Sequence, residues 1–164
     1  MNTIEAQRAR LKAVLHECSV HAERIAYARE MCAPLFPLDA EAYSKLDAKA
    51  IQQLDQLVYR FTKLQDALGA KLFPLLTAEL REDAVTLTVL DRLAALEKAG
   101  AVPSADEWLE LREVRNQLAH DYHDDPENGA EYLNDLYRSS ERLLVYNDQV
   151  RTFVHDRVLH DSTE

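Results

Sequence analysis

The sequence has few residues that break helices or favour strands. Three glycines and five prolines occur among 164 residues, and Val and Ile together number 14, against 25 Leu and 22 Ala. Leu and Ala are strong helix formers, whereas β-branched residues favour strands. This imbalance argues against a sheet-rich protein and predicts an all-α fold.

Cysteine and long apolar runs are also scarce. The two cysteines are Cys18 and Cys32, and on one helix they would lie about 21 Å apart, too far for a disulfide. No run approaches the roughly 18 apolar residues of a membrane span, and Met1–Glu5 resembles no secretory signal. We therefore expect reduced thiols, no membrane partner and a cytoplasmic location.

Positive charge is in deficit. Lys and Arg number 19 and Asp and Glu number 29, which gives a net charge of −10 at pH 7. Such a balance argues against binding nucleic acid through bulk positive charge, although a local basic site remains compatible with it. The length is typical of one domain, so we expect residues 1–164 to form a single domain with a sizeable core.

Hydrophobic periodicity predicts about five amphipathic helices, which short connections would arrange as an antiparallel bundle. Their expected ranges are Thr3 to about Cys32, a start between Asp39 and Asp47 to an end or kink near Gly69 and Pro74, about Ala84–Ala99, Ser104 to about Tyr122, and about Ala130–Leu159. Ile51 and Leu90 are among the residues expected to face inward. The pair Asn128-Gly129 is expected to form the turn before the last helix.

The fourth helix has the clearest start. Ser104 and Glu107 have the spacing of a capping box, in which each side chain accepts a hydrogen bond from the other residue's backbone N–H. On a helical wheel, the apolar residues from Trp108 to Tyr122 share one arc, and Arg115 falls inside it. A guanidinium stays charged, so Arg115 needs a carboxylate such as Asp55 or Asp66, an exit to solvent, a partner surface or an anion.

Arg115, Asn116 and His120 form a set suited to acid–base attack on a phosphodiester. His120 can take a proton at neutral pH, Arg115 can stabilise charge on phosphate oxygens, and Asn116 can orient either group. Arg115 and His120 lie about 140° apart around a regular helix. Both reach one small anion only if the helix loosens or two copies of it meet, and the second option predicts a homodimer.

This chemistry needs neither a metal nor a cofactor when the ribose 2′-hydroxyl of RNA is the nucleophile. The residues His120, His123 and Asp124 could also be interpreted as metal ligands. They lack the distant further ligand that a metal site requires, so we expect no metal.

Residues 115–122 read Arg-Asn-Gln-Leu-Ala-His-Asp-Tyr and match the Arg-x4-His-x-Tyr motif of HepT-type toxins. These toxins are small helical ribonucleases of the HEPN superfamily. Residues 59–69 also resemble a second helix common in these toxins, and the resemblance covers about residues 45–155. The first helix is longer than is usual in the family. The resemblance implies a HEPN-like helical bundle.

The resemblance also implies an activity and partners. It implies a homodimeric, metal-independent endoribonuclease in which Arg115 and His120 are catalytic and Asn116 supports them. It further implies a cognate antitoxin, a minimal nucleotidyltransferase as in HepT/MntA-like pairs, which silences the toxin by adenylylating Tyr122. Tyr122 lies within about 20° of Arg115 on the wheel, so an adenylyl group there could engage Arg115.

The acidic surroundings of the motif depart from what an RNA-binding site favours. Asp121, Asp124 and Asp125 place negative charge beside it, which disfavours a polyanionic substrate. The alternative hypothesis is therefore a non-catalytic helical adaptor, or a substrate-binding partner, of a nucleotidyltransferase.

Overall fold

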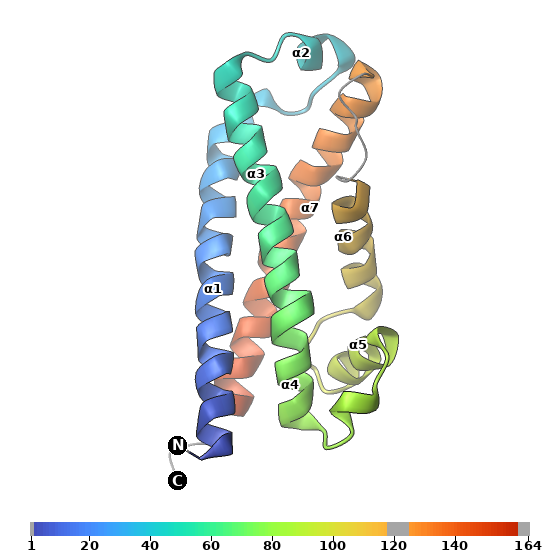
Figure 1. The fold of residues 1–164 in the computed structure, drawn as a ribbon. Coiled ribbons are helices and arrows are strands. Elements are labelled where there is room, and N and C mark those ends of the chain that lie inside the picture. The colour runs from blue at the N-terminus through green and yellow to red at the C-terminus, as the bar shows by residue number, and fades with distance from the viewer. Residues whose placement is uncertain (1, 118–124, 161–164) are drawn as a thin grey trace.

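The computed structural model describes residues 2–117 and 125–160. Within these ranges every regular element is a helix and no strand occurs, so the predicted all-α class is confirmed. The α-helices of the described residues are α1 (Thr3–Cys32), α2 (Ala40–Ser44), α3 (Ala48–Asp66), α4 (Phe73–Leu80), α5 (Val89–Lys98), α6 (Ala105–Gln117) and α7 (Pro126–Phe153) (Figure 1).

The helix α1 matches its predicted range. Asn2 and Glu5 form a capping box at its start, with the Ile4 N–H donating to the Asn2 side chain at 3.2 Å. Both cysteines of α1 are free and buried, and burial raises the pKa of Cys18 to about 12. The buried residues of this helix are Leu11, Leu15, Cys18, Ile25, Ala28 and Cys32.

The second predicted helix changes its pitch instead of ending near Gly69. The helix α3 continues through a π-helical segment, Ala67–Leu72, into α4. Pro74 lacks the N–H that an α-helix would use to bond the preceding turn, and a locally wider helix accommodates that loss. The predicted irregularity is therefore a π-helical segment within one rod (Figure 1).

The start predicted for the third helix is wrong. Ala84–Thr86 form a short 3₁₀ turn, and α5 begins at Val89. Thr88 caps α5, because its hydroxyl accepts a hydrogen bond from the Asp91 N–H at 3.1 Å. The predicted stop at Gly100 is present, with a φ of 79° that favours glycine.

Two residues expected to face inward are exposed. Leu90 is 63% exposed because α5 packs through the side that carries Leu93 and Leu96, and Leu90 lies off that side in its first turn. Ile51 is exposed in the first turn of α3, at the rim of a hollow that Leu54 also lines. Periodicity overstated the width of the buried face at both helix starts.

The last helix starts earlier than predicted. The helix α7 begins at Pro126 rather than Ala130, since the Asp125 side chain caps it and proline suits the first helical position. Gly129 is helical and makes no turn. A Cβ at Gly129 would lie 2.5 Å from Cζ of Tyr43, so the glycine lets α2 pack closely against α7.

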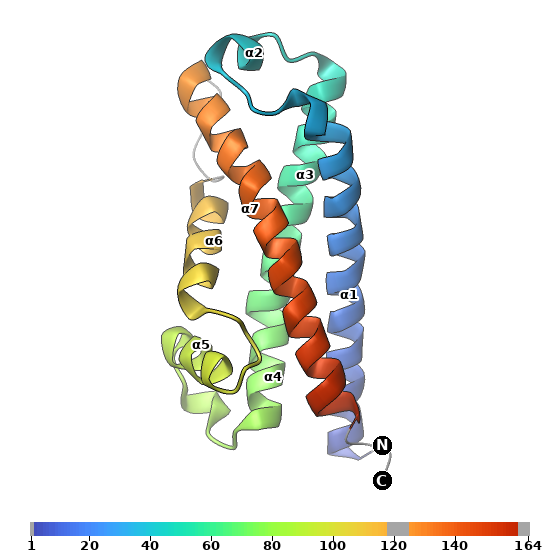
Figure 2. The ribbon, with the colours of Figure 1, turned by 180° about the vertical axis from the view of Figure 1, so that it is seen from behind.

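Three long helical segments, α1, α3 with α4, and α7, run side by side along the molecule (Figures 1 and 2). The helix α1 is antiparallel to both α3 and α7, and α3 and α7 are parallel to each other. The helix α6 packs antiparallel to α7 and α3, while α5 lies across the end of α4. The five predicted helices correspond to these elements, and the short α2 was not predicted.

One cluster of buried side chains forms the core. It draws on all the long helices, and its largest fully buried members include Tyr146, Phe61 and Phe73. The helix α7 is continued by a π-helical segment, Val154–Leu159, whose Val154 and Val158 join the same cluster. None of the described helices combines the length and apolar character needed to cross a membrane.

Candidate functional site

The residues predicted for the site lie at the end of α6 and directly after it. Arg115 and Asn116 belong to the last turn of α6. His120 and Tyr122 lie outside the described residues. The site can therefore be built from its arginine and from what holds α6 in place.

Two consecutive residues of α3 hold α6 from one side. The Gln65 side chain is buried and its Nε2 donates to the Leu111 carbonyl oxygen at 2.6 Å. Asp66 accepts a hydrogen bond from Arg115, with Nη2 and Oδ1 3.1 Å apart. Because Leu111 and Arg115 are one turn apart, these two contacts fix the position of α6 along its axis and its rotation about that axis, relative to α3.

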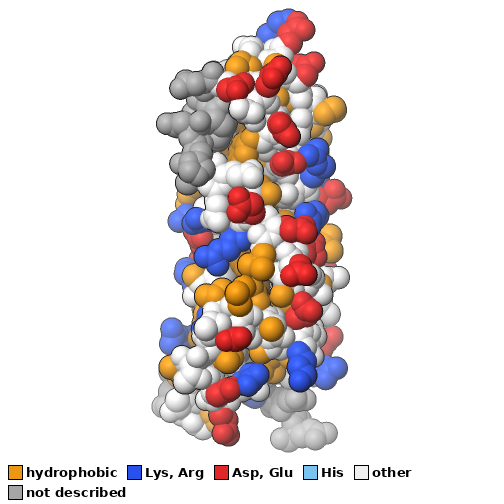
Figure 3. Space-filling model, turned by 90° about the vertical axis from the view of Figure 1, so that its right-hand side faces the viewer, with side chains coloured by type: hydrophobic (Ala, Val, Ile, Leu, Met, Phe, Trp, Pro, Cys, Tyr) orange, Lys and Arg blue, Asp and Glu red, His pale blue; other side chains and the backbone are white. Residues whose placement is uncertain are grey.

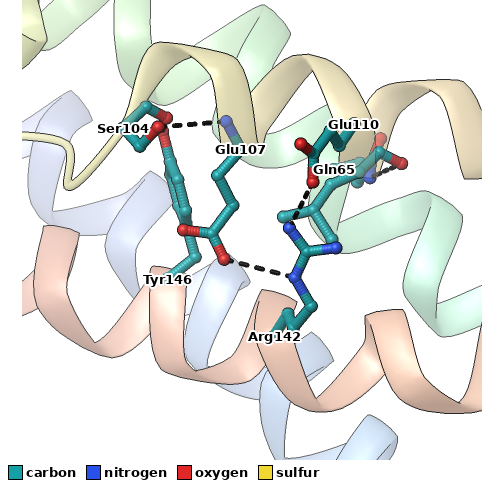
Figure 4. A network of polar contacts seen from close by, with 7 residues as sticks. Gln65, Ser104, Glu107, Glu110, Arg142 and Tyr146 are labelled. Atoms are coloured by element: carbon teal, nitrogen blue, oxygen red, sulfur yellow. Dashed lines mark hydrogen bonds and ion pairs between the residues drawn. The ribbon is translucent and has the colours of Figure 1, made fainter.

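The helix α7 holds the opposite side of α6 (Figure 4). Arg142 of α7 bonds Glu110 through Nη2 at 2.6 Å, and its Nε lies 3.4 Å from Glu107. The Tyr146 hydroxyl donates to the Ser104 carbonyl oxygen at 3.1 Å. Burial raises the pKa of Tyr146, so the hydroxyl keeps the proton that it donates.

The capping box predicted for α6 is half present. The Glu107 N–H donates to the Ser104 hydroxyl at 3.1 Å, as expected. The Glu107 carboxylate, in contrast, pairs with Arg142. A tertiary ion pair has replaced the local reciprocal bond, which a four-residue pattern cannot predict.

Arg115 lies at the edge of the buried arc. Trp108 and Leu111 are buried, as the wheel predicts, whereas the Arg115 side chain is 38% exposed and Asn116 is exposed. Asp66, one of the two carboxylates expected for Arg115, is 45% exposed. An ion pair this open contributes about 0–1 kcal/mol to stability, so its main effect is to orient the guanidinium.

Among the described residues, Arg115 uses little of its hydrogen-bonding capacity. A guanidinium carries five N–H donors, and the contact with Asp66 is the hydrogen bond that its side chain makes among the described residues. The remaining donors can bind an anion without breaking that contact. The arrangement therefore provides an oriented and partly exposed cation.

Arg115 lines a pocket of about 310 Å³ where α6 meets α5 and the π-helical segment. Two more arginines, Arg92 of α5 and Arg112 of α6, line the same pocket. The lining residues are Gln65, Asp66, Gly69, Ala70, Phe73, Pro74, Val89, Arg92, Leu93, Trp108, Arg112 and Arg115. A local basic site thus exists in this acidic protein.

Close packing shapes the floor of this pocket. A Cβ at Gly69 would lie 2.9 Å from Cζ2 of Trp108, so the glycine lets α6 approach the π-helical segment. Phe73 meets Trp108 edge to face, with ring centroids 4.8 Å apart. Both rings are almost fully buried, so they form a wall and offer no exposed face on which a base could stack.

Of the acidic residues that flank the motif, Asp125 is described. Its carboxylate caps α7 by accepting from the Glu127 N–H at 3.1 Å, so its charge is engaged at a helix start, where negative charge is favourable. The other flanking aspartates, Asp121 and Asp124, and the metal-ligand candidate His123 lie outside the described residues.

Sequence reasoning missed three contributors to this site. Gln65 lies one turn after the buried Phe61, and a polar residue on that apolar stripe is a signal that could have found it. Arg92 and Arg112 gave no such signal, because the crossing of α5 and α6 brings them to one pocket.

Comparisons of the chain with protein-family models, with curated proteins and with solved structures found no match.

Proposed function

We propose that the protein is a HepT-like toxin of the HEPN type, a metal-independent endoribonuclease. The observation that carries this proposal is the Arg-x4-His-x-Tyr motif, whose arginine, Arg115, is oriented by Asp66 at an arginine-lined pocket. An active-site arginine must keep free donors while its position is fixed, and Arg115 meets both conditions.

The proposed reaction is an internal transesterification. His120 removes the proton of a ribose 2′-hydroxyl, the oxygen bonds to phosphorus, and the bond from phosphorus to the 5′-oxygen breaks. The 5′-oxygen takes a proton from water or from the partner's His120, and a 2′,3′-cyclic phosphate remains. Arg115 stabilises the charge that develops on the phosphate oxygens, and Asn116, which is exposed beside it, orients the reacting groups.

A homodimer would complete this site. The 140° between Arg115 and His120 on a regular helix favours two copies that meet near the end of α6. The exposure of Asn116 and Gln117 in the last turn of α6 is compatible with such a contact.

Silencing by a nucleotidyltransferase antitoxin is part of the proposal. Transfer of AMP from ATP to the Tyr122 hydroxyl releases pyrophosphate and adds an anionic group next to the motif. That group could occupy the donors of Arg115 that Asp66 leaves unused. Intact-mass analysis after co-expression with the cognate enzyme tests this step, and an unmodified tyrosine in a neutralised complex would contradict it.

The activity is tested with purified protein, single-stranded RNA and EDTA. We expect cleavage that leaves 2′,3′-cyclic phosphate ends, and we expect His120→Ala to abolish it while the melting temperature is unchanged. Arg151→Gln on α7, which removes an exposed arginine paired with Asp148, is the matched control and should cleave normally.

The adaptor hypothesis predicts another result in the same assay. Its supporting observation is the net charge of −10, which favours a protein partner over RNA. A folded protein that cuts no RNA, yet forms a stable complex with the nucleotidyltransferase, would replace the ribonuclease proposal with this one.

A further inference from the structure

Three arginines line one pocket with a single carboxylate to balance them. Arg92, Arg112 and Arg115 are contributed by α5 and α6, and Asp66 is the acidic residue of the lining. Among the described residues, neither Arg92 nor Arg112 forms an ion pair. Figure 3 shows Lys and Arg side chains beside an apolar patch on this face, with acidic side chains along one edge.

Arg92 carries the most specific signal. It is half-buried, and its Nε is shielded from solvent without a hydrogen-bond partner in the part of the chain that the structure describes. A shielded N–H of a charged group without a partner costs free energy. Arg92 also lines the pocket, and its guanidinium carries four N–H donors besides that of Nε with which to bind an anion.

The pocket also has an apolar side. Phe73 and Trp108 are almost fully buried beneath it, and an apolar side chain that a ligand can reach is Val89, which is exposed at the rim. A ligand with a charged group and an apolar body fits such a site better than a bare inorganic ion does. Nucleotides have this construction, and guanidinium groups bind phosphate oxygens through paired N–H donors.

We propose that this pocket is a phosphate-binding subsite for RNA. In it, Arg92 and Arg112 hold the phosphoryl group of a nucleotide next to the one that Arg115 holds for cleavage. The claim that the pocket binds an anion is based on its lining residues, whereas the claim that this anion belongs to an RNA strand rests on the proposed function. The acidic protein would then hold RNA at a few fixed contacts rather than through its overall charge.

Asp66 is a positioning residue in this arrangement. It holds Nη2 of Arg115 at 3.1 Å, at the boundary between the motif and the subsite. Asp66→Asn keeps the size of the side chain but removes its negative charge, which weakens the hydrogen bond to Arg115. We expect this variant to lower kcat by a larger factor than it raises KM. A purely structural role would instead lower the melting temperature and leave kcat and KM of the folded protein unchanged.

The test measures the affinity of the intact chain for an oligonucleotide with 2′-O-methyl sugars, which cannot be cleaved. Arg92→Gln and Arg112→Gln should each weaken binding by roughly tenfold, since each loses a charge-assisted hydrogen bond. Each should also reduce the slope of log K against log salt by about 0.7. Arg151→Gln, the matched loss of charge on α7, should bind within about twofold of the parent protein.

Equal weakening by all three variants would overturn the proposal, because it would show binding through overall charge. Unchanged affinity in Arg92→Gln and Arg112→Gln would overturn it as well. AMP provides the second arm: if AMP binding depends on Arg92 and Arg112 but the oligonucleotide does not bind, the anion site stands and its assignment to RNA is wrong. If the oligonucleotide binds as expected but unmodified RNA is not cleaved, the subsite stands and the proposed ribonuclease fails.

Discussion

The two sides of α6 differ in how many carboxylates neighbour each arginine. On the side facing α7, Arg142 lies between Glu107 and Glu110, so one cation meets two carboxylates. On the side facing α5, three arginines line a pocket that contains one carboxylate, Asp66. The arginines come from three helices, Arg142 from α7, Arg92 from α5, and Arg112 and Arg115 from α6, so the difference arises from how these helices pack.

The contrast is between two kinds of arginine. Arg142 has two carboxylate partners and links α7 to α6, whereas the three arginines of the pocket share one carboxylate and are those that we propose bind an anion. A compensated cation such as Arg142 links two helices, and its charge is already satisfied. Neighbouring cations that share too few carboxylates repel one another, and an anion bound among them would relieve that repulsion. The charge balance is why we propose that the side of α6 facing α5 is the one that binds an anion.

The largest expected effect is on catalysis by the uncompensated side. Arg115→Ala should lower the rate of RNA cleavage by about 100-fold or more, the effect of removing one donor that stabilises transition-state charge. Its melting temperature should change little, because the ion pair with Asp66 is exposed. Cleavage at the parent rate would show that Arg115 is not catalytic, and a large fall in melting temperature would place it among the structural arginines.

The next largest effect is expected from a substitution that disturbs the packing at the floor of the pocket. Gly69→Ala places a Cβ 2.9 Å from Trp108 and should cost about 1–3 kcal/mol in the free energy of unfolding, measured with urea. Gly129→Ala, which crowds Tyr43 instead, is the matched variant and should also destabilise the fold. Gly69→Ala alone should weaken oligonucleotide binding, and equal binding by both variants would show that the pocket is not involved.

A smaller effect is expected on the compensated side. Arg142→Met should cost about 0.5–1 kcal/mol of stability, because it removes a partly exposed ion-pair network while keeping much of the apolar stem. Oligonucleotide affinity should stay at the parent value. A loss of affinity as large as that of Arg92→Gln would erase the distinction between the two sides.

The smallest effect is on the stability of the pocket variants. Arg92→Gln should leave the free energy of unfolding within about 0.5 kcal/mol of the parent value, since Nε of Arg92 has no hydrogen-bond partner among the described residues. Urea denaturation checks this. A destabilisation larger than that of Arg142→Met would show that Arg92 supports the fold.

Local signals predicted the parts of the molecule that depend on a few neighbouring residues. The Ser104 cap, the stop at Gly100 and the buried stripe of α1 follow from short patterns. Asp66 was one of two carboxylates, with Asp55, named as candidate partners of Arg115, because a cation on an apolar arc needs a carboxylate or another outlet for its charge.

Features that depend on how helices cross were not predictable in the same way. Gly129 resembles a turn glycine in the sequence, but its function is the close approach of Tyr43. The bond from Gln65 to α6 and the meeting of Arg92 with Arg112 depend on tertiary contacts that no periodicity encodes. The catalytic role of His120 and the adenylylation of Tyr122 stay predictions from the motif.

The most direct measurement is a structure of the protein with the 2′-O-methyl oligonucleotide bound. The account predicts one phosphate within hydrogen-bonding distance of Arg115 and a neighbouring phosphate bound by Arg92 or Arg112, with the pair between Arg142 and Glu110 unchanged. An oligonucleotide bound away from this side of α6 would contradict the claim that the uncompensated arginines form the ligand site.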